Sequence, residues 1–225
     1  DAYKAFGEDA FLTAAKTSTD HILKQVRQPD GGLYHVYKEG RSYIEGFLDD
    51  YALMISALIS LFEITGDTVL LDEAEYFTAY VIENFYEPEE NLFYYTSNTR
   101  DTLIVRNIEV TDTIIPSSNS VLAQELFRLS RLTGKTDYYE LSLRMLERIS
   151  GRTLAGPEFF SHWAERILFE LNPYYEVVVA GPNADQISQE LQKFYLPNTD
   201  FAAASGPNDQ LGLFAYRYSE DETRI

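Results

Sequence analysis

Apolar residues recur at helical spacing through most of the chain, and they do so in two different patterns. Between Tyr51 and Phe62 they cover nearly every side of the predicted helix, a pattern typical of a helix that is buried on both sides. After Gly66 they form a single stripe, with acidic residues elsewhere, which predicts a helix with one solvent-facing side. Buried and half-exposed helices are therefore expected to alternate along the chain.

A sequence repeat relates these helices to one another. Gly7, Gly66 and Gly134 occupy equivalent positions, 59 and 68 residues apart, and similar residues follow each of them at the same spacing. Thr65-Gly66 and Thr133-Gly134 have the form of helix C-caps, because glycine adopts the left-handed conformation without strain. Each unit is thus predicted to be a helix, a tight turn and a second helix.

These units are longer than the ~34 to 47 residues of common helical repeats. Long connecting segments, at residues 28–49 and 87–117, separate one pair of helices from the next. Both features favour a partial α/α toroid, in which inner helices line a centre and outer helices surround them; an open helical solenoid is the alternative. We expect any binding or catalytic residues on the long loops.

The pattern changes after residue 172. Residues 175–180 form a β-branched run, residues 184–195 a helical pattern, and residues 199–204 a second strand, which together predict a right-handed βαβ unit. We therefore expect a mainly α protein with an α/α-hairpin toroid segment at residues 1–172 and a small C-terminal βαβ appendage with an acidic tail at residues 173–225. The turn after the first strand lacks the glycines of a nucleotide-binding loop, so we expect a structural role for it.

Three strings in this order carry a family resemblance: GFLDDYA at residues 46–52, LFEITGD at residues 61–67, and PSSNS at residues 116–120 followed by LTG at 132–134. The chain resembles the spermatogenesis-associated thioredoxin-domain family and its bacterial relatives from about residue 30 to 200. The resemblance implies an α/α barrel related to six-hairpin glycosidases and to N-acylglucosamine 2-epimerase. The family's thioredoxin-like domain is absent here, so no redox activity is implied. The chain departs from the family at Glu90-Asn91, where relatives often have two glycines, and in its last twenty residues.

Polar side chains fall at equivalent places near the starts of the buried helices. An offset of 68 aligns Asp49, Asp50 and Tyr51 with Ser117, Ser118 and Asn119, and equivalent positions of a toroid lie on one rim. The preceding loops add further carboxylates to this rim, namely Glu45, Glu109 and Asp112. Glycoside hydrolysis needs such a pair, one carboxyl as the acid and the other as the base or nucleophile. Helix capping is the alternative role for Asp49 and Asp50, and simple solvation is the alternative for Glu109 and Asp112.

Histidines and tyrosines supply further candidates for the same rim. His35 and His162 fall on segments that could approach it and would suit an epimerase-like proton transfer, whereas His21 is expected in a helix. Tyrosines cluster in the two long loops, where their rings could stack on sugars or fill gaps between helices; they are Tyr34, Tyr37, Tyr94 and Tyr95. We expect Ser117, Ser118 and Asn119 to contribute to binding, not to nucleophilic attack, because no paired base accompanies them.

Composition narrows the classes of partner. The 225 residues carry a net charge of −18, which would repel nucleic acids and anionic membranes. There is no cysteine, close metal-binding spacing or apolar run long enough for a membrane span, so we expect no metal, cofactor or membrane partner. The chain begins as if inside a helix, without a signal peptide, which suggests a cytoplasmic fragment whose exposed barrel edges a homodimer would cover.

Two hypotheses about function follow from these observations. The first is a carbohydrate-binding or carbohydrate-processing barrel that would act, if it is an enzyme, as a glycoside hydrolase or a sugar epimerase. The second is a non-catalytic scaffold or interaction domain that serves a thioredoxin-like domain.

Overall fold

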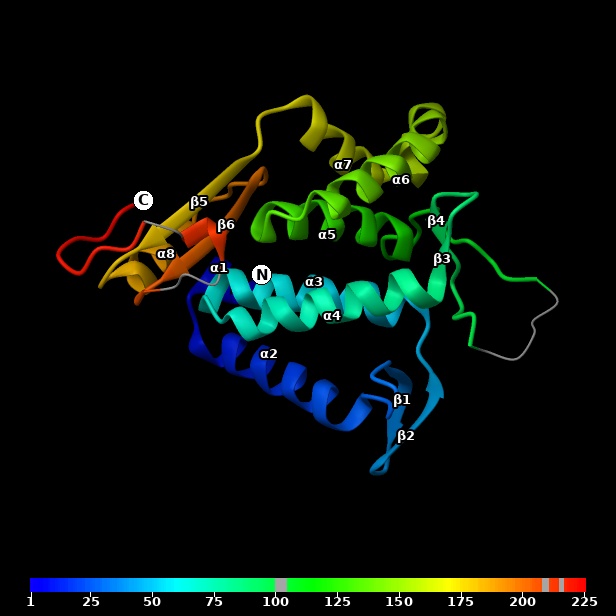
Figure 1. The fold of residues 1–225 in the computed structure, drawn as a ribbon, viewed down its shortest axis with the longest axis horizontal. Helices are drawn as coiled ribbons and strands as arrows, with labels where there is room; N and C mark the ends of the chain where they lie inside the picture. Colours follow the sequence, from blue (N-terminus) through cyan, green and yellow to red (C-terminus); the bar gives the residue numbers. More distant parts are fainter. Residues whose placement is uncertain (100–104, 208–210, 215–216) are drawn as a thin grey trace.

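Two helical hairpins form the centre of the fold. The first joins α3 (Leu48–Thr65) to α4 (Thr68–Phe85), and the second joins α5 (Ser118–Thr133) to α6 (Thr136–Ala155). A computed structural model describes residues 1–99, 105–207, 211–214 and 217–225 (Figure 1). The inner helices α3 and α5 pack against each other, and each packs against the outer helix that follows it. The predicted partial α/α toroid is therefore confirmed.

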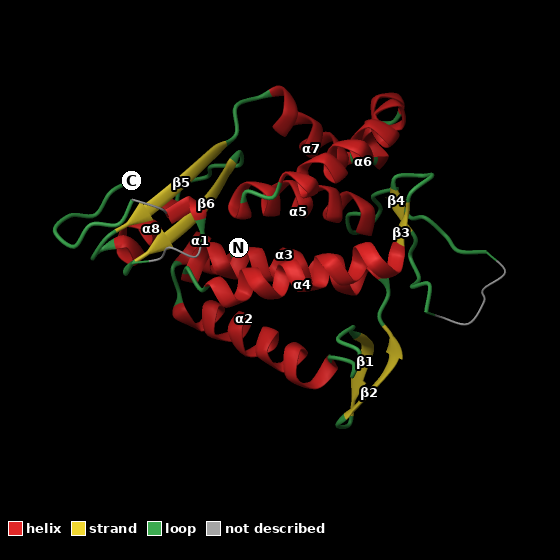
Figure 2. Cartoon of the chain, in the orientation of Figure 1, coloured by secondary structure: helices red, strands yellow, loops and turns green. Residues whose placement is uncertain are grey.

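Smaller elements surround these hairpins (Figure 2). The chain opens with α1 (Ala2–Phe6) and α2 (Asp9–His21), the latter extended by a π-helical turn at Ile22–Val26. Two antiparallel strand pairs follow, β1 (Tyr34–Lys38) with β2 (Arg41–Glu45) and β3 (Tyr86–Glu87) with β4 (Leu92–Phe93). Short 3-10 turns lie at Pro157–Phe159 and Gly212–Phe214, and α7 (Ser161–Leu171) packs on α5 and α6.

The predicted βαβ unit is present. Strands β5 (Tyr175–Ala180) and β6 (Thr199–Ala204) pair in parallel, with Tyr175 opposite Thr199, and α8 (Ala184–Gln192) connects them. The helix ends at Gln192, three residues before the expected Tyr195. Strand β6 lies so close to the end of α3 that a Cβ atom at Gly66 would be 2.3 Å from the carbonyl oxygen of Ala203.

The glycine turns behave as the repeat predicts. Gly7, Gly66 and Gly134 adopt φ values of 69°, 67° and 77°, and each donates its backbone N–H to a carbonyl oxygen four residues earlier. The first long segment differs from the expected irregular loop, because it contains the β1–β2 hairpin. Its two strands allow the chain to reverse and still satisfy its backbone hydrogen-bonding groups.

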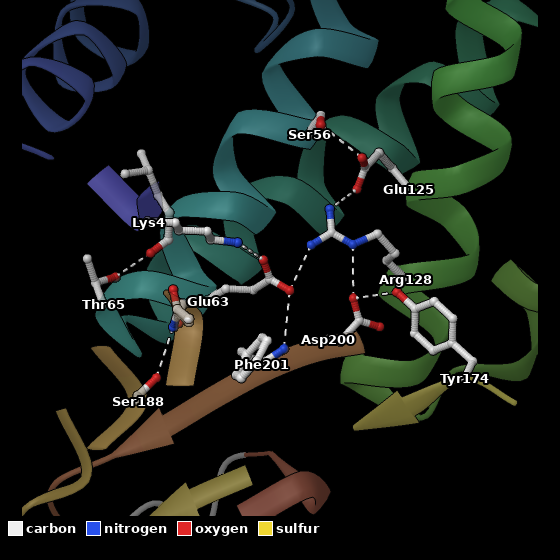
Figure 3. Close-up of polar contacts among 12 residues, drawn as sticks. Lys4, Ser56, Glu63, Thr65, Glu125, Arg128, Tyr174, Ser188, Asp200 and Phe201 are labelled. Atoms are coloured by element: carbon white, nitrogen blue, oxygen red, sulfur yellow. Dashed lines mark hydrogen bonds and ion pairs between the residues drawn. The ribbon is translucent and has the colours of Figure 1, made fainter. Parts of the chain in front are cut away.

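A cluster of buried charges joins the two inner helices to the βαβ unit (Figure 3). The guanidinium of Arg128 on α5 contacts three carboxylates at 2.9 Å each: Glu63 on α3, Glu125 on α5 and Asp200 on β6. Lys4 on α1 lies 2.7 Å from Glu63. All three carboxylates are buried. The buried cluster therefore holds three negative groups against two positive ones when every group is ionised.

Neighbouring hydrogen bonds complete the cluster. Ser56 donates to Glu125 at 2.8 Å, Tyr174 donates to Asp200 at 3.0 Å, and the backbone N–H of Phe201 donates to Glu63 at 3.2 Å. Burial, with a further contribution from the charge of Glu63, raises the pKa of Asp200 to about 6 although Arg128 opposes the shift. Burial also acts against ionisation of Glu63, but Arg128 and Lys4 outweigh it and lower the pKa of Glu63.

Replacement of the central cation tests this cluster. Arg128→Met should destabilise the protein by ~3–5 kcal/mol, because three buried carboxylates lose their common partner. Arg144→Met on the exposed face of α6 removes an ion pair of 3.9 Å with Glu140 and should cost less than ~1 kcal/mol. Urea unfolding followed by circular dichroism measures both free energies. Equal losses in the two variants would contradict the central role of Arg128.

The raised pKa of Asp200 predicts a pH dependence of stability. A carboxyl group whose pKa is 3.8 in the unfolded chain and about 6 in the fold stabilises the fold below pH 3.8 and loses this contribution as pH rises through 6. The stability of the natural protein relative to Asp200→Asn should therefore fall between pH 4 and pH 7. Urea unfolding of both proteins across this range measures the difference, and a difference that rises with pH would refute the assignment.

Candidate functional site

The N-termini of α3 and α5 lie at one end of the molecule, opposite the βαβ unit (Figure 1). Both helices run in the same direction, and Ser56 of α3 reaches Glu125 of α5 across their interface. The long segments that precede them meet at this end, where the backbone N–H of Leu48 donates to the carbonyl oxygen of Tyr95 at 3.0 Å. We call this end the rim.

A histidine and a carboxylate pair at the rim. His35 Nδ1 on β1 lies 2.9 and 3.1 Å from the two oxygens of Asp50. When Asp50 is ionised it only accepts hydrogen bonds, so in that state Nδ1 carries the proton and Nε2 is the basic nitrogen. Burial, together with the charge of Asp49, raises the pKa of Asp50, although the N–H of Phe47 and the His35 ring act in the opposite direction.

Two aromatic rings adjoin this pair. Phe47 and Tyr95 stack with centroids 5.1 Å apart and planes within 12°, and the edge of His35 meets Phe47 at 4.9 Å. The Tyr95 hydroxyl donates to Asp49 at 3.1 Å. Burial raises the pKa of Tyr95, and the charges of Asp49, Glu109 and Asp50 raise it further. Asp49 thus contacts the phenol directly, and the charges of Asp50 and Glu109 act on it as well.

Glu109 reaches the rim from the second long segment. Ser118, the first residue of α5, donates its hydroxyl to Glu109 at 2.9 Å. The Glu109 side chain is half-buried, whereas Ser118 is buried. The structure thus brings Asp49, Asp50 and Glu109 together with His35, in an arrangement that could exchange protons with a ligand.

Asp112 and His162 lie on the other side of α5 and have different surroundings. Asp112 is buried and accepts three hydrogen bonds of 2.8 Å, from the Ser117 N–H, the Ser120 hydroxyl and the His162 N–H. It therefore ties the start of α5 to the start of α7. The His162 ring lies 3.5 Å from Glu165 on its own helix. The contacts of Asp112 therefore give it a structural role at the starts of α5 and α7.

Asn119 and Tyr51 brace the two long segments in equivalent ways. Asn119 is buried; it accepts from the Phe93 N–H at 2.8 Å and donates to the Phe93 and Glu109 carbonyl oxygens. The Tyr51 hydroxyl accepts from the N–H of Leu33 at 2.8 Å. Both side chains hold the strand before their helix, and their polar atoms face protein groups.

The predicted tyrosines separate into two sites. Tyr34 and Tyr37 on β1 line a groove of about 900 Å³ between α2 and α3, together with His35 and Asp50. Tyr37 also meets the ring of His21 edge-on at 4.7 Å. Tyr94 lies instead under the guanidinium of Arg106, 4.0 Å from its ring centre. Tyr34 and Tyr37, like Tyr95, therefore share the surroundings of the histidine–carboxylate pair, whereas Tyr94 does not.

One detail of the predicted rim is wrong. Ser117 is the N-cap of α5, whereas α3 begins at Leu48, so Asp49 and Asp50 lie inside the first turn of their helix. Asp50 accepts from the N–H of Phe47, the N-cap residue, at 2.8 Å. The offset of 68 still aligns Tyr51 with Asn119, but α3 starts two residues earlier within the repeat than α5 does. Phe47 was missed, although acidic residues two and three positions after it, Asp49 and Asp50, are a signal for a helix start.

Neither a metal-binding cluster nor a membrane-spanning helix is found in the part of the chain that the structure describes. Among residues 1–99, 105–207, 211–214 and 217–225, no group of three histidine, aspartate or glutamate side chains could hold a metal ion. In the same part of the chain, no helix combines the length and the apolar character needed to span a membrane.

Curated relatives confirm the family resemblance seen in the sequence. An uncharacterised protein of Caenorhabditis elegans is 24% identical over 226 residues, which cover 92% of this chain and 31% of that protein. Spermatogenesis-associated protein 20 of Rattus norvegicus and of Mus musculus are each 26% identical over 166 residues, covering 72% of this chain and 21% of theirs. The chain thus spans between a fifth and a third of the length of these relatives.

Two solved structures share the fold. A GH76 α-mannanase of Bacteroides thetaiotaomicron superposes with a TM-score of 0.52 at 17% identity, over 67% of this chain and 40% of that one. Cellobiose 2-epimerase of Bacillus thermoamylovorans superposes with a TM-score of 0.53 at 15% identity, over 65% of this chain and 39% of that one. The fold is therefore that of the α/α toroids related to six-hairpin glycosidases.

The profile of glycosyl hydrolase family 47 matches residues 53–170, which include most of α3 and the whole of α4, α5 and α6. This match covers just over half of the 225 residues. On this evidence the chain belongs to glycosyl hydrolase family 47.

Proposed function

We propose that the rim binds and processes a carbohydrate. The observation that carries this proposal is the contact of the His35–Asp50 pair and of Asp49 with the Phe47–Tyr95 stack, at the end of the inner helices where Glu109 binds Ser118. Aromatic faces suit the apolar faces of sugar rings, and carboxylates suit their hydroxyl groups. The two structural neighbours named above, a mannanase and a cellobiose epimerase, support a saccharide as the ligand.

The carboxylates suggest one reaction, glycoside hydrolysis. Asp50, whose pKa burial raises, would donate its proton to the oxygen of the leaving group as the glycosidic bond breaks. Glu109 or Asp49 would act as the base and take a proton from the water that attacks the sugar carbon. The half-buried position of Glu109 leaves it open to such a water.

His35 suggests a second reaction on the same class of ligand. Its Nδ1 is directed at Asp50, so Nε2 would be the atom that takes a proton from one face of a sugar carbon, and epimerisation is complete when a second group or a water delivers a proton to the opposite face of that carbon. The side chain of His35 is 39% exposed, which gives a ligand access to the ring. Asp50 would then orient the imidazole instead of protonating a leaving group. The non-catalytic scaffold remains the competing function, and it predicts no affinity for saccharides.

Asp50→Asn tests the proposal in the full-length natural protein. The introduced amide keeps an oxygen that can accept from the Phe47 N–H, so the melting temperature should change little. Turnover or binding of α-mannan oligosaccharides or cellobiose should fall by ~100-fold or more, because the acid or the orienting group is lost. Calorimetric titration and reducing-sugar or epimer analysis measure these effects.

Asp67→Asn is the matched control for this substitution. Asp67 accepts from the N–H of Val69 at the start of α4, at the other end of the hairpin from the rim, so its replacement should leave saccharide binding intact. If the natural protein binds neither saccharide and Asp50→Asn mainly lowers its melting temperature, the carbohydrate proposal fails and the scaffold is favoured.

Glu109→Gln and Asp112→Asn should separate chemistry from bracing. The amide introduced by Glu109→Gln can still accept from Ser118, so we expect a loss of turnover by ~10-fold or more with nearly unchanged stability. Asp112→Asn weakens three hydrogen bonds, two of them buried, and should lower the free energy of unfolding by ~1–3 kcal/mol. Urea unfolding measures stability, and a saccharide assay measures the rate of turnover. A loss of stability in Glu109→Gln together with a loss of turnover alone in Asp112→Asn would contradict these roles.

A further inference from the structure

The groove between α2 and α3 is open although both of its walls have the pattern of a packed interface. It has a volume of about 900 Å³ and extends from α1, where Tyr3 lines it, to β1, where Tyr37 does. Its middle is formed mostly by aliphatic and small side chains, such as Leu12 and Ala15 of α2 and Leu53 and Ala57 of α3.

The α2 wall corresponds to a buried surface in the next hairpin. Six side chains of the outer helix α4 are buried: Leu71, Ala74, Phe77, Thr78, Val81 and Phe85. The residues 59 positions earlier all line the groove: Leu12, Ala15, Ser18, Thr19, Ile22 and Val26. Within α2 itself only Thr19 is buried. The first outer helix therefore has the same packing face as α4, without the inner helices that cover α4.

The α3 wall of the groove also corresponds to a surface that is buried in the next hairpin. Five of its groove residues, at positions 53, 54, 57, 61 and 64, correspond at an offset of 68 to residues of α5 that are all buried: Val121, Leu122, Glu125, Leu129 and Leu132. Helix α5 packs against α3, the inner helix before it. In α3, by contrast, Leu53 is 49% exposed and Ala57 is also exposed, whereas Met54 and Leu61 are buried. The face of α3 that would meet a preceding inner helix is thus partly uncovered.

Helix α1 indicates the direction of that inner helix. Gly7 caps α1 as Gly66 caps α3, so the five residues of α1 correspond to the last turn of an inner helix. Asp1 aligns with Ser60, and α3 has a further twelve residues, 48–59, before that position. Twelve helical residues span about 18 Å. Asp1, Ala2 and Tyr3 all line the groove at the end where such a helix would enter it.

We propose that the groove is the seat of an inner helix that continues α1 in its N-terminal direction, formed by residues that precede Asp1 in the natural protein. The curated relatives are longer than this chain, which spans 21–31% of them, so a protein of this type has chain available for such a helix. The helix is amphipathic: aliphatic side chains meet Ala15, Ala57 and Ser60, whose small size leaves room for them, and its remaining face is polar.

The proposed helix has a consequence for the rim. Its first residue aligns with Leu48, so its N-terminus lies at the groove end that His35, Asp50 and Tyr34 line. Unpaired backbone N–H groups there would add a third helix terminus to those of α3 and α5. Only this consequence rests on the proposed carbohydrate function, because the seat itself follows from the repeat and the groove.

Single cysteines test the seat, since the chain has no cysteine of its own. Ala15→Cys places a thiol on the groove wall, and Ala14→Cys places one on the adjacent exposed residue outside it. Each is made in the 225-residue chain and in a longer form that carries about 20 of the natural protein's own preceding residues, long enough for the helix and its connection. The measured quantity is the rate of modification by N-ethylmaleimide.

We expect both thiols to react quickly in the 225-residue chain, and the Ala15→Cys thiol to react ~10-fold or more slowly in the longer form while Ala14→Cys is unchanged. Equal rates for the Ala15→Cys thiol in the two forms would overturn the proposal. Protection in the 225-residue chain that increases with protein concentration would also overturn it, because a second copy would then cover the groove.

Ala57→Trp supplies a second readout that does not depend on a thiol. Ala57 is exposed in the 225-residue chain, so the larger side chain should leave its melting temperature almost unchanged. In the longer form the tryptophan would collide with the seated helix and lower the melting temperature by several degrees. An unchanged melting temperature in both forms would overturn the proposal. Saccharide binding is not measured, so this result and a failure of the proposed function remain distinguishable.

Discussion

The ion cluster centred on Arg128 fixes the arrangement on which the other features depend. It links α3, α5 and β6 through one guanidinium, and none of its three carboxylate partners is exposed to water. Burial of charges is costly unless they are paired with good geometry, so few alternative packings of these elements satisfy all of the groups. The cluster therefore favours one register between the inner helices, and the βαβ unit is attached through the same contacts.

That register explains why polar residues distant in sequence meet at the rim. When α3 and α5 run side by side in one direction, their N-termini and the segments before them share one end of the molecule. Side chains there have two kinds of environment. Asp112 and Asn119 are buried, with their polar atoms bonded to the protein, whereas Asp50 and His35 pair at the surface of the groove. Asp50 and His35 can therefore respond to a ligand, because their contacts include solvent-accessible atoms.

Local patterns predicted some elements and not others. The β-branched run at Tyr175–Ala180 and the strand at Thr199–Ala204 were predicted at the observed residues, since each lies between clear turn signals. The Arg128 cluster could not be predicted, because Glu63 and Asp200 are 137 positions apart and only the folded chain brings them together. The start of α3 was misplaced because Phe47 is not a usual N-cap, and the pairing of His35 with Asp50 depends on the β1–β2 hairpin, which the loop pattern did not indicate.

The repeat supports the groove and the rim to different degrees. The walls of the groove consist of apolar and small positions whose spacing recurs along α2, α4 and α6 and is set by packing. The rim consists of individual polar side chains, and these do not recur: Asp50 pairs with His35, whereas Ser118 binds Glu109. A shared architecture constrains the apolar and small positions of the groove, because every inner helix has to pack against its neighbours. It does not constrain the polar side chains of the rim, so the chemistry of the rim has to be established residue by residue.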